Sequence, residues 1–409
     1  MIIGFILALL LGIIAGTITG LIPGIHINLV SILLLSFSPA LLSITAPITL
    51  VTFIVAMAIT HTFLDFIPSI LLGAPEEDSL LSVLPGHQLL MQGRGYFAII
   101  YTLNGGLIAL VIILIFTPIF IYLLPIVYPF IQKIMPLVLI TIAIYLVFME
   151  EKEKRLWALC IFLTAGFLGI AALNLNLKEP LLPLLTGLFG ASSLIMSIHQ
   201  ETKIPPQRIV PLYQIRLNKK SLTKATLGTV IASPFTAFLP GLGASQAAVI
   251  GTQVCNIKDQ REFLFLLGAI STIVMGLSFV TFYTITKMRT GAAVAVAKLI
   301  PELSMQNLIT ILITIILSGL LAYTFAVFIA KIAIKNITKI NYKKLSLITL
   351  ATITLIVIIF ADYTLIGKIK GLVIFITATA LGIFTINKNI RRINLMSCLL
   401  IPTILFYIS

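Results

Sequence analysis

The stretch Thr19–Asn28 reads T-G-L-I-P-G-I-H-I-N, and a related stretch, Thr236–Ser245, reads T-A-F-L-P-G-L-G-A-S. Pro23 and Pro240 lie 217 residues apart, and each is followed by Gly and then by a branched aliphatic residue. A Pro-Gly pair interrupts a helix, because Pro lacks a backbone N–H and Gly tolerates unusual dihedrals. Inside a bilayer such breaks are tolerated only where the freed backbone is buried in protein or lines a watery cavity. Two breaks at matching places in two halves of a polytopic chain point to a transporter binding site.

The composition is that of a membrane protein. Of the 409 residues, 59% are hydrophobic and only 10% are charged, and stretches such as 99–131 and 345–360 are long enough to cross a bilayer. The expected fold class is therefore all-α, a polytopic integral membrane protein with ten to twelve membrane segments, multi-pass in the cell membrane. Residues 1–22 have no basic n-region and no cleavage site, so we expect a retained first helix and not a signal peptide. The three cysteines have no paired spacing, which indicates neither disulfides nor a metal cluster, and no cofactor is expected.

The net charge of +14 is spread over short loops and does not form one basic patch. Most basic residues fall in four intervals between hydrophobic spans, 152–155, 203–224, 331–344 and 388–392. Positive charge in short loops marks the cytoplasmic side of a membrane protein. The distribution argues against nucleic acid as a partner. It also predicts that the turns near Lys133, Lys178 and 362–370 face outward.

The hydrophobic pattern predicts an order of crossings and a division into two halves. Full crossings are expected at 97–127, 134–149, 156–174, 180–198, 305–330, 345–361, 371–386 and 393–408. Residues 1–72 and 225–300 are less regular and should hold further crossings with re-entrant or broken helices. We expect a first transmembrane repeat over 1–199, a cytoplasmic linker over 200–224 and a second, inverted repeat over 225–409. The alternative for the polar, Pro-containing interval 200–221 is an ordinary cytoplasmic loop.

The two Pro-Gly breaks form the first candidate site. After each break the chain should restart as a helix, whose first N–H groups lack intrahelical partners and attract carboxylate or phosphate. The expected substrate-binding residues are Thr19, Gly20, Pro23, Gly24, His26 and Asn28 in the first copy, and Thr236, Pro240, Gly241, Gly243, Ser245 and Gln246 in the second. The alternative is a packing kink, because the spacing Gly12-x-x-x-Gly16-x-x-x-Gly20 also lets helices approach closely.

A second candidate is the pair His61 and Asp65 in the apolar segment A-I-T-H-T-F-L-D-F-I-P. Their i, i+4 spacing places both side chains on one face of a helix. Ionisable groups in an apolar span are costly, and they usually face a cavity or a partner. The pair could relay protons or help to hold a coupling cation such as Na⁺. Alternatively, the two side chains satisfy each other as a structural pair.

Other charged residues are less informative. Glu76, Glu77 and Asp78 are adjacent acids of the kind found in a solvated loop or at a helix N-terminus. Lys287 and Arg289 could steer an anion, or they could anchor the chain at the lipid headgroups. No HExxH or GxSxG motif occurs, so a membrane-embedded enzyme is poorly supported.

With these motifs the chain resembles the large membrane subunit of tripartite tricarboxylate transporters, the TctA family. The matching residues are Gly16, Gly20, Pro23 and Gly24, then Leu72-Gly73-Ala74-Pro75 with Pro85-Gly86-His87 and Gly93-Arg94-Gly95, and finally Pro240-Gly241-Leu242-Gly243. The resemblance covers residues 10–110, and it covers 225–300 to a lesser degree. It implies a secondary transporter that takes up di- or tricarboxylates with a small membrane subunit and an extracytoplasmic binding protein. This chain is shorter than typical large subunits, it carries the acidic run 76–78, and it reads P-G-I-H-I-N where P-G-L-G-P is common.

The expected function is a secondary active permease, not an enzyme, for an organic anion such as a di- or tricarboxylate, coupled to a Na⁺ or H⁺ gradient. The expected partners are the small anionic substrate, the coupling ion, membrane lipid and the two subunits that the resemblance implies. The alternative is a stand-alone transporter without these two subunits. A flippase for a lipid-linked phosphate such as polyprenyl phosphate is the first alternative, because opposed broken helices also suit a phosphate headgroup. A membrane-embedded enzyme or scaffold is a less favoured alternative.

Overall fold

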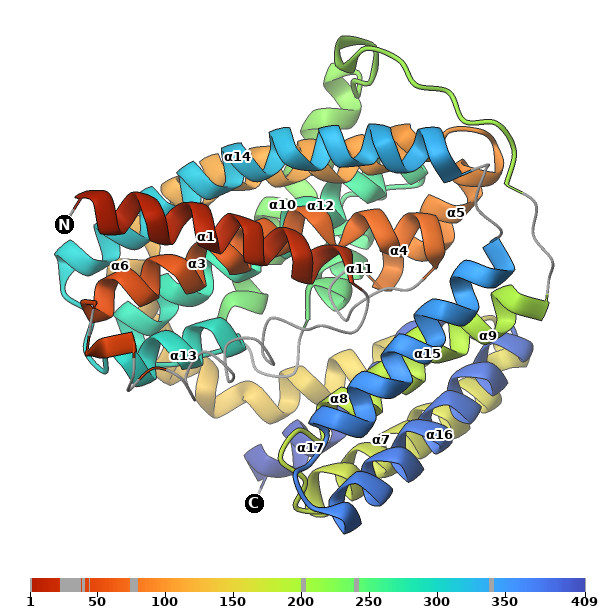
Figure 1. Ribbon diagram of the computed structural model, residues 1–409. Coiled ribbons are helices and arrows are strands. Elements are labelled where there is room, and N and C mark those ends of the chain that lie inside the picture. The colour runs from red at the N-terminus through yellow and green to blue at the C-terminus, as the bar shows by residue number, and fades with distance from the viewer. Residues whose placement is uncertain are drawn as a thin grey trace.

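The computed structural model describes residues 2–22, 38, 41–43, 45–73, 80–199, 204–238, 243–337 and 342–408. These residues form helices throughout and contain no strand, so the all-α expectation is confirmed (Figure 1). Within the same ranges, seven helices are long and apolar enough to cross a membrane, and three shorter apolar helices accompany them. The chain is a multi-pass membrane protein.

The helices follow one another in an order that matches most of the expected crossings. In chain order they are α1 (Ile2–Leu21), α3 (Pro47–Leu64), α4 (Phe66–Leu72), η1 (Leu80–Ser82), α5 (Val83–Met91), α6 (Gly95–Phe148), η2 (Lys152–Lys154), α7 (Arg155–Asn174), α8 (Leu181–Leu185), the π-helix η3 (Thr186–Ala191), α9 (Ser192–His199), η4 (Leu212–Gln214), α10 (Lys219–Phe238), α11 (Ala244–Val254), α12 (Gln260–Ile285), α13 (Gly291–Leu299), α14 (Met305–Ile337), α15 (Tyr342–Phe360), α16 (Leu365–Asn387), η5 (Arg392–Met396) and α17 (Ser397–Ile408).

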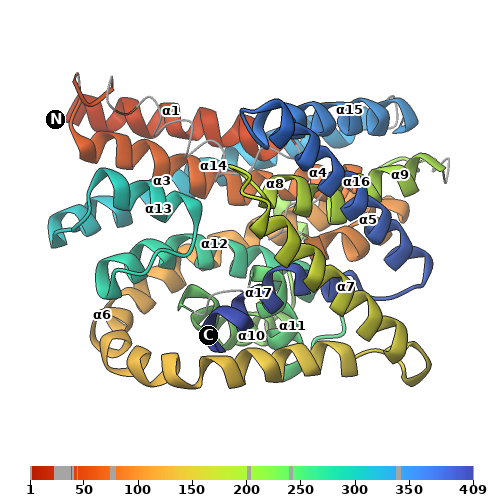
Figure 2. The ribbon, with the colours of Figure 1, turned by 90° about the horizontal axis from the view of Figure 1, so that it is seen from below.

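One expectation was wrong. The crossings predicted at 97–127 and 134–149 are parts of the single 54-residue helix α6, and Lys133 lies inside it, not in a turn. Four prolines stand within α6, at positions 118, 125, 129 and 136. Each removes one main-chain hydrogen bond and bends the helix. Figure 2 shows α6 running in one direction, curving and returning. The bends in the helix therefore reverse the direction of the chain, as the expected loop would have done.

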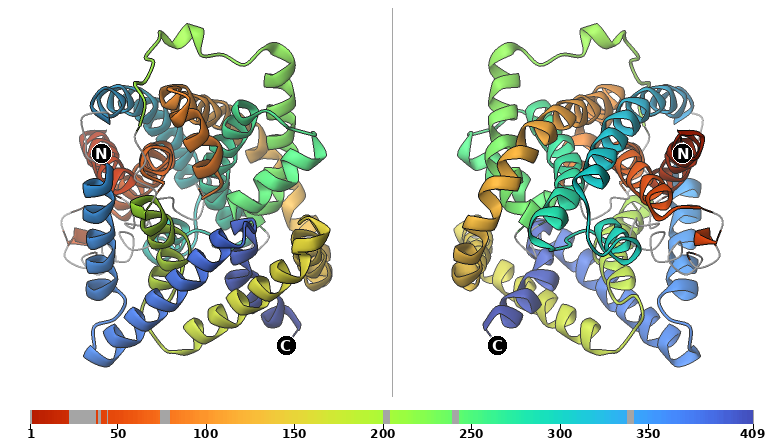
Figure 3. Two further views of the ribbon diagram at one scale, coloured as in Figure 1. Left: turned by 90° about the vertical axis from the view of Figure 1, so that its right-hand side faces the viewer. Right: turned by 90° about the vertical axis from the view of Figure 1, so that its left-hand side faces the viewer.

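The helices pack into two bodies with separate hydrophobic cores. The first body contains α1, α3–α5, α6 up to Tyr128, and α10–α14. The second body contains α6 from Ile131 onward, α7–α9 and α15–α17. Figures 1 and 3 show the two bodies as separate groups of helices, with the first above the second.

Close helix contacts depend on small residues. A Cβ added at Gly16 of α1 would lie 2.4 Å from the Met57 carbonyl oxygen of α3. A Cβ at Gly105 of α6 would lie 2.0 Å from the Phe265 carbonyl oxygen of α12. Glycine at these positions lets the backbones approach, as is common between membrane helices. The hydrophobic segments containing α3 and α12 are the most enclosed membrane-length spans that the structure describes, with 94% of the residues buried in an 18-residue stretch of each.

The break between α3 and α4 has a local cause. Pro68 has no amide hydrogen to give to the carbonyl of Leu64, the residue four positions before it. Helix α3 accordingly ends at Leu64, and α4 begins at Phe66. Asp65 occupies the junction, so an ionisable residue lies at a helix break inside the first body.

Candidate functional site

The end of α1 meets the middle of α3 through a buried polar contact. The Nδ1 atom of His61 lies 3.0 Å from the hydroxyl oxygen of Thr19, and both residues are at most 5% exposed. The Thr19 hydroxyl also lies 3.2 Å from the carbonyl oxygen of Gly16, to which it can donate. Because a hydroxyl has one proton, His61 must donate from Nδ1 whenever Thr19 donates to Gly16. The contact therefore links the first Pro-Gly motif to the His61–Asp65 pair.

Asp65 lies within the same buried region and is 3% exposed. Its main-chain nitrogen donates to the His61 carbonyl at 3.0 Å, and its carbonyl accepts from the Ser69 hydroxyl at 2.7 Å. These bonds bridge the junction of α3 and α4. They hold His61 and Asp65 one helical turn apart, as their spacing predicts.

Thr236, near the end of α10, repeats the main-chain contact of Thr19. Its hydroxyl donates to the Ser233 carbonyl at 2.8 Å, the position 217 residues after the Gly16 carbonyl that Thr19 contacts. Thr236 and Ser233 are both fully buried. The two motifs thus begin with the same local hydrogen bond.

A helix restarts after the second Pro-Gly pair. Helix α11 begins at Ala244, and the carbonyl of Gly243 accepts from the Ala247 amide at 3.2 Å. Ser245 is fully buried in the first turn. Gln246 belongs to α11, but its side chain is not among those described. The predicted residues Pro23, Gly24, His26, Asn28, Pro240 and Gly241 lie outside the described residues.

The first motif also has the packing role that was left open as an alternative. A Cβ at Gly20 would lie 2.9 Å from the Cβ of Leu64 and 3.1 Å from the His61 carbonyl oxygen. Gly12 and Gly16 face α3 in the same way. The glycines therefore set the short separation between α1 and α3 that brings Thr19 to His61.

A group of hydroxyls in the innermost helices was not predicted. The Thr62 hydroxyl of α3 lies 3.3 Å from the Thr272 hydroxyl of α12, and both side chains are buried. Three other hydroxyls, those of Thr60, Ser271 and Thr281, have no hydrogen-bond partner within the part of the chain that the structure describes. Ser and Thr recurring in the apolar helix α12 could have signalled this polar interior.

The candidate charge Lys287 does not join this region. Lys287 is exposed in the turn that follows α12, as expected for an interfacial anchor. The acidic run 76–78 lies outside the described residues. Among the residues that are described, no group of three or more His, Cys, Asp and Glu side chains could hold a metal ion.

The first turn of α12 carries an exposed ion pair. Asp259 caps the helix by accepting from the Arg261 amide at 2.8 Å, and it forms a two-pronged pair with the Arg261 guanidinium. The side-chain hydrogen bond from Arg261 is the main cause of the lowered pKa of Asp259. This pair stabilises the beginning of the innermost helix of the second half.

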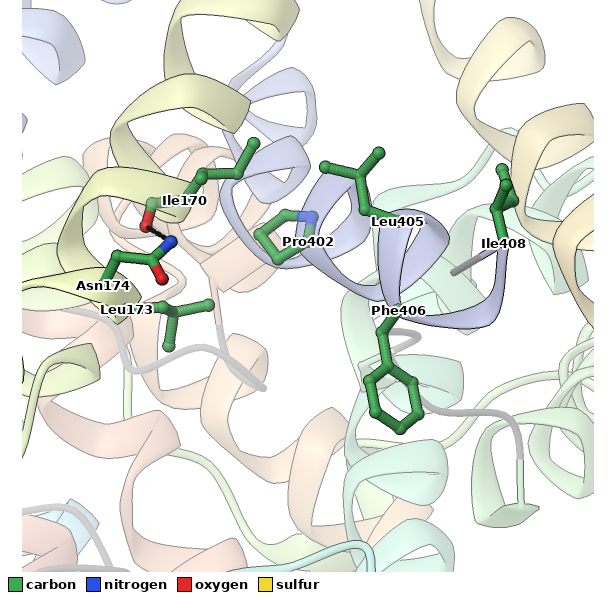
Figure 4. Close-up of a pocket in the computed structure, with 7 residues that line it drawn as sticks. All are labelled: Ile170, Leu173, Asn174, Pro402, Leu405, Phe406 and Ile408. Carbon is green, nitrogen blue, oxygen red and sulfur yellow. Dashed lines mark hydrogen bonds between the residues drawn. The ribbon is translucent and has the colours of Figure 1, made fainter.

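An apolar groove lies in the second body, away from these polar groups. It has a volume of about 460 Å³, and Figure 4 shows its lining by α7 and α17, with Leu173, Leu405 and Phe406 among the residues. Its polar side chain, Asn174, donates to the Ile170 carbonyl at 2.9 Å. The groove offers no charge to an anion and does not qualify as the substrate site.

The fold and this site define a polytopic α-helical membrane protein with polar groups at its centre, as membrane transporters have. Residues 6–397 match the Tripartite tricarboxylate transporter TctA family. The chain belongs to this family and is a component of a tricarboxylate transporter, so the resemblance seen in its motifs is confirmed.

A comparison with curated proteins finds an uncharacterized protein of Methanocaldococcus jannaschii. It is 31% identical over 370 residues, which cover 88% of each chain. No solved structure matches the chain.

Proposed function

We propose that this protein is a permease that moves a di- or tricarboxylate across the membrane, driven by a Na⁺ or H⁺ gradient. The observation that carries the proposal is the family match over residues 6–397. The buried polar groups on α1, α3 and α12 support it, because ionisable and polar residues at the centre of a membrane protein usually serve transport.

The substrate site proposed for this permease is built by the two Pro-Gly motifs. Two observations support this placement. Thr19 contacts His61, and α11 begins directly after the second motif, so the positive end of its helix dipole lies at this motif and favours a carboxylate. In this proposal His61 and Asp65 couple the substrate to the driving ion.

We also propose that the chain consists of two repeats joined by a cytoplasmic linker. Helices α1 and α10 are both 20 residues long and begin at Ile2 and Lys219, 217 residues apart. The matching hydrogen bonds of Thr19 and Thr236 support the same register. Helix α3 with α4 and helix α12 then occupy equivalent places, although a break interrupts only the first.

A small membrane subunit and an extracytoplasmic binding protein are proposed as partners, since the family is one of tripartite transporters. The experiment is uptake of labelled citrate, succinate and malate into proteoliposomes that contain this chain with and without the two partners. An imposed Na⁺ gradient and an imposed pH gradient would be compared. Uptake of at least one acid under one gradient is expected.

A parallel assay would follow translocation of a fluorescent polyprenyl phosphate between leaflets. Translocation of this lipid without uptake of any acid would contradict the permease and favour the lipid-linked phosphate. Variants Pro23→Ala and Pro240→Ala are expected to abolish acid uptake while leaving the amount of membrane-inserted protein unchanged.

A further inference from the structure

We propose that the first body carries the described residues of the substrate site, Thr19, His61, Thr236 and Ser245, and moves as a unit against the second body, with a hinge in α6. This inference rests on the proposed function, because that function makes these residues a substrate site. The division into two bodies does not depend on the proposed function. In this motion one body slides along the other, which differs from a rocking of the two sequence halves about a site between them.

The division of the core is the first observation. The larger cluster of buried apolar residues extends along α6 as far as Tyr128 and resumes in α10–α14. A separate cluster begins in α6 at Met135 and includes α7, η3, α16 and α17. Both sequence halves contribute to both bodies. Because well-packed cores shift as units, the boundary between two cores is the natural place for relative motion.

The second observation is that, among the residues that the structure describes, few apolar side chains join the two bodies. Among the described helices, α6 is the only one that packs extensively within both. The apolar side chains of the first body that pack against the cores of the second are Leu72, Leu81 and Val249, and all three are only partly buried. A sparse apolar contact of this kind is weakly held and can slide at small cost.

The third observation is the helix that connects them. Between Tyr128 and Met135, α6 passes from one core to the other, and its prolines 125, 129 and 136 surround this passage. Proline leaves the carbonyl four residues earlier without its helical donor, which softens the helix at that point. Three of the four prolines of α6 therefore lie at or beside the passage, and this is where the helix bends most easily.

The fourth observation is the location of the site. Thr19, His61, Thr236 and Ser245 lie on α1, α3, α10 and α11, which all belong to the first body. The apolar residues of the first body that touch the second are Leu72 on α4, Leu81 on η1 and Val249 on α11. Helix α4 follows the break at Asp65, and α11 follows the second motif. Displacement of the first body would thus uncover the site on one side and cover it on the other.

Distances between spin labels test the inference directly. The three native cysteines would be replaced by alanine, and labels would be placed at exposed positions in liposome-reconstituted protein. The pair Asn218 and Lys152 spans the two bodies. The pair Ile2 and Met288 joins the two sequence halves inside the first body, and Lys152 with Tyr363 serves as the control within the second body.

We expect a broad or two-peaked distance distribution for the pair Asn218 and Lys152, which spans the two bodies. The two pairs within a body should each give a narrow distribution. Citrate should shift the weight between the peaks of the distribution for Asn218 and Lys152. The inference would be overturned if the distances between Asn218 and Lys152 were distributed as narrowly as those of the two pairs within a body and did not change with citrate. A change confined to Ile2 and Met288 would also overturn it, because that is the signature of the halves rocking within the first body.

A matched pair of proline variants tests the hinge. Pro129→Ala restores a helical hydrogen bond at the passage and should narrow the distribution between the bodies. Pro118→Ala, which is equally exposed but lies within the first body, should leave it unchanged. If Pro129→Ala and Pro118→Ala changed the distance distribution between the bodies equally, a hinge between Tyr128 and Met135 would be contradicted. If no acid is taken up but the bodies still move, the proposed function fails and this inference stands.

Discussion

At the residue scale, the contact between Thr19 and His61 joins two features that are separate in the sequence. The two residues are 42 positions apart, and each belongs to a motif that the sequence singles out for its own reason. The hydroxyl and the imidazole nitrogen lie 3.0 Å apart in a region without solvent exposure. A polar contact is stronger in such surroundings, and its loss is correspondingly more costly.

Removing the Thr19 hydroxyl should impair transport. Thr19→Val keeps the shape of the side chain but removes the hydroxyl that contacts His61. The loss of this hydrogen bond should cost about 1–1.5 kcal/mol, which corresponds to roughly a tenfold fall in uptake rate. Thr19→Ser should retain most of the activity. The measurement is initial uptake of labelled citrate per amount of reconstituted protein.

Thr17→Val is the matched control. The Thr17 hydroxyl donates only to the Ile13 carbonyl, one turn earlier on the same helix. This variant should transport normally. If Thr17→Val and Thr19→Val were equally impaired, a general loosening of α1 would explain both.

The capping pair at Asp259 gives a second prediction at this scale. Asp259→Ala removes the cap of α12 and should cost about 1 kcal/mol, seen as a fall of a few degrees in the thermal melting temperature in detergent. Asp259→Asn keeps a side-chain oxygen that can cap the helix, so its melting temperature should fall less. Because the folded-state pKa of Asp259 is lowered, chiefly by the Arg261 hydrogen bond, the stabilisation is present at neutral pH. It should fade as the pH falls through that pKa, so the difference between wild type and Asp259→Asn should shrink in acid.

At the element scale, small residues determine which helices become neighbours. Helix α1 lies against α3 along Gly12, Gly16 and Gly20, and α6 lies against α12 through Gly105 and Gly268. The spacing of the first three glycines is visible in the sequence. The packing of Gly105 against α12 is not visible in the sequence, because nothing near Gly105 or Gly268 indicates the distant partner of either residue.

Substitution of Gly16 should disrupt the α1–α3 pair. In Gly16→Ala the new Cβ would approach the Met57 carbonyl oxygen to 2.4 Å and the Thr60 Cβ to 2.7 Å, so the backbones must separate. We expect a melting temperature lower by several degrees and a smaller monodisperse peak in size-exclusion chromatography.

Gly4→Ala is the control on the same helix. Its added Cβ would meet only the Thr49 side chain, at 3.9 Å, which is ordinary contact. It should behave as the wild type does. A destabilised Gly4→Ala would mean that helix propensity or membrane insertion, and not close approach, decides the effect.

At the scale of the whole molecule, the described part of the proposed linker, from residue 204 onward, is attached to the first body. The Gln207 side chain accepts from the Gly95 amide at 2.8 Å and donates to the Leu90 carbonyl at 2.8 Å. The Arg208 amide donates to the carbonyl of Gly93 at 2.9 Å. Further along, the Asn104 amide group lies within 3.4 Å of the carbonyl of Ile215, which is buried in the larger core. The linker is thus held at two places.

Loss of the Gln207 contacts should expose the linker to protease. Gln207→Ala removes bonds worth about 1 kcal/mol each, so trypsin should cleave after the exposed Arg208 roughly ten times faster under native conditions. Gln214→Ala is the control, because the Gln214 side chain donates to the hydroxyl of its exposed neighbour Tyr213 and not to a distant part of the described chain. Equal cleavage of the two variants would show that the attachment at Gln207 is unimportant.

Much of this architecture could be predicted because a bilayer imposes simple rules on sequence. Long apolar stretches must become helices, since no other open structure satisfies the backbone in lipid, and α7, α14 and α16 lie close to the positions that hydropathy indicates. The rule fails in α6, where Lys133 and four prolines predict a turn but the helix merely bends. Proline permits either a bend or the end of a helix, and the packing of the two arms decides between them.

The sequence by itself determined the helical, multi-pass character of the protein, the family motifs and the identity of the residues that could meet an anion. Those features follow from local chemistry, namely hydropathy, helix breaking and residue spacing. Only the tertiary structure decided that Thr19 reaches His61, that hydroxyls of α3 and α12 meet, and that the cores divide across both sequence halves. These depend on contacts between residues far apart in the chain, which packing selects and no local pattern records.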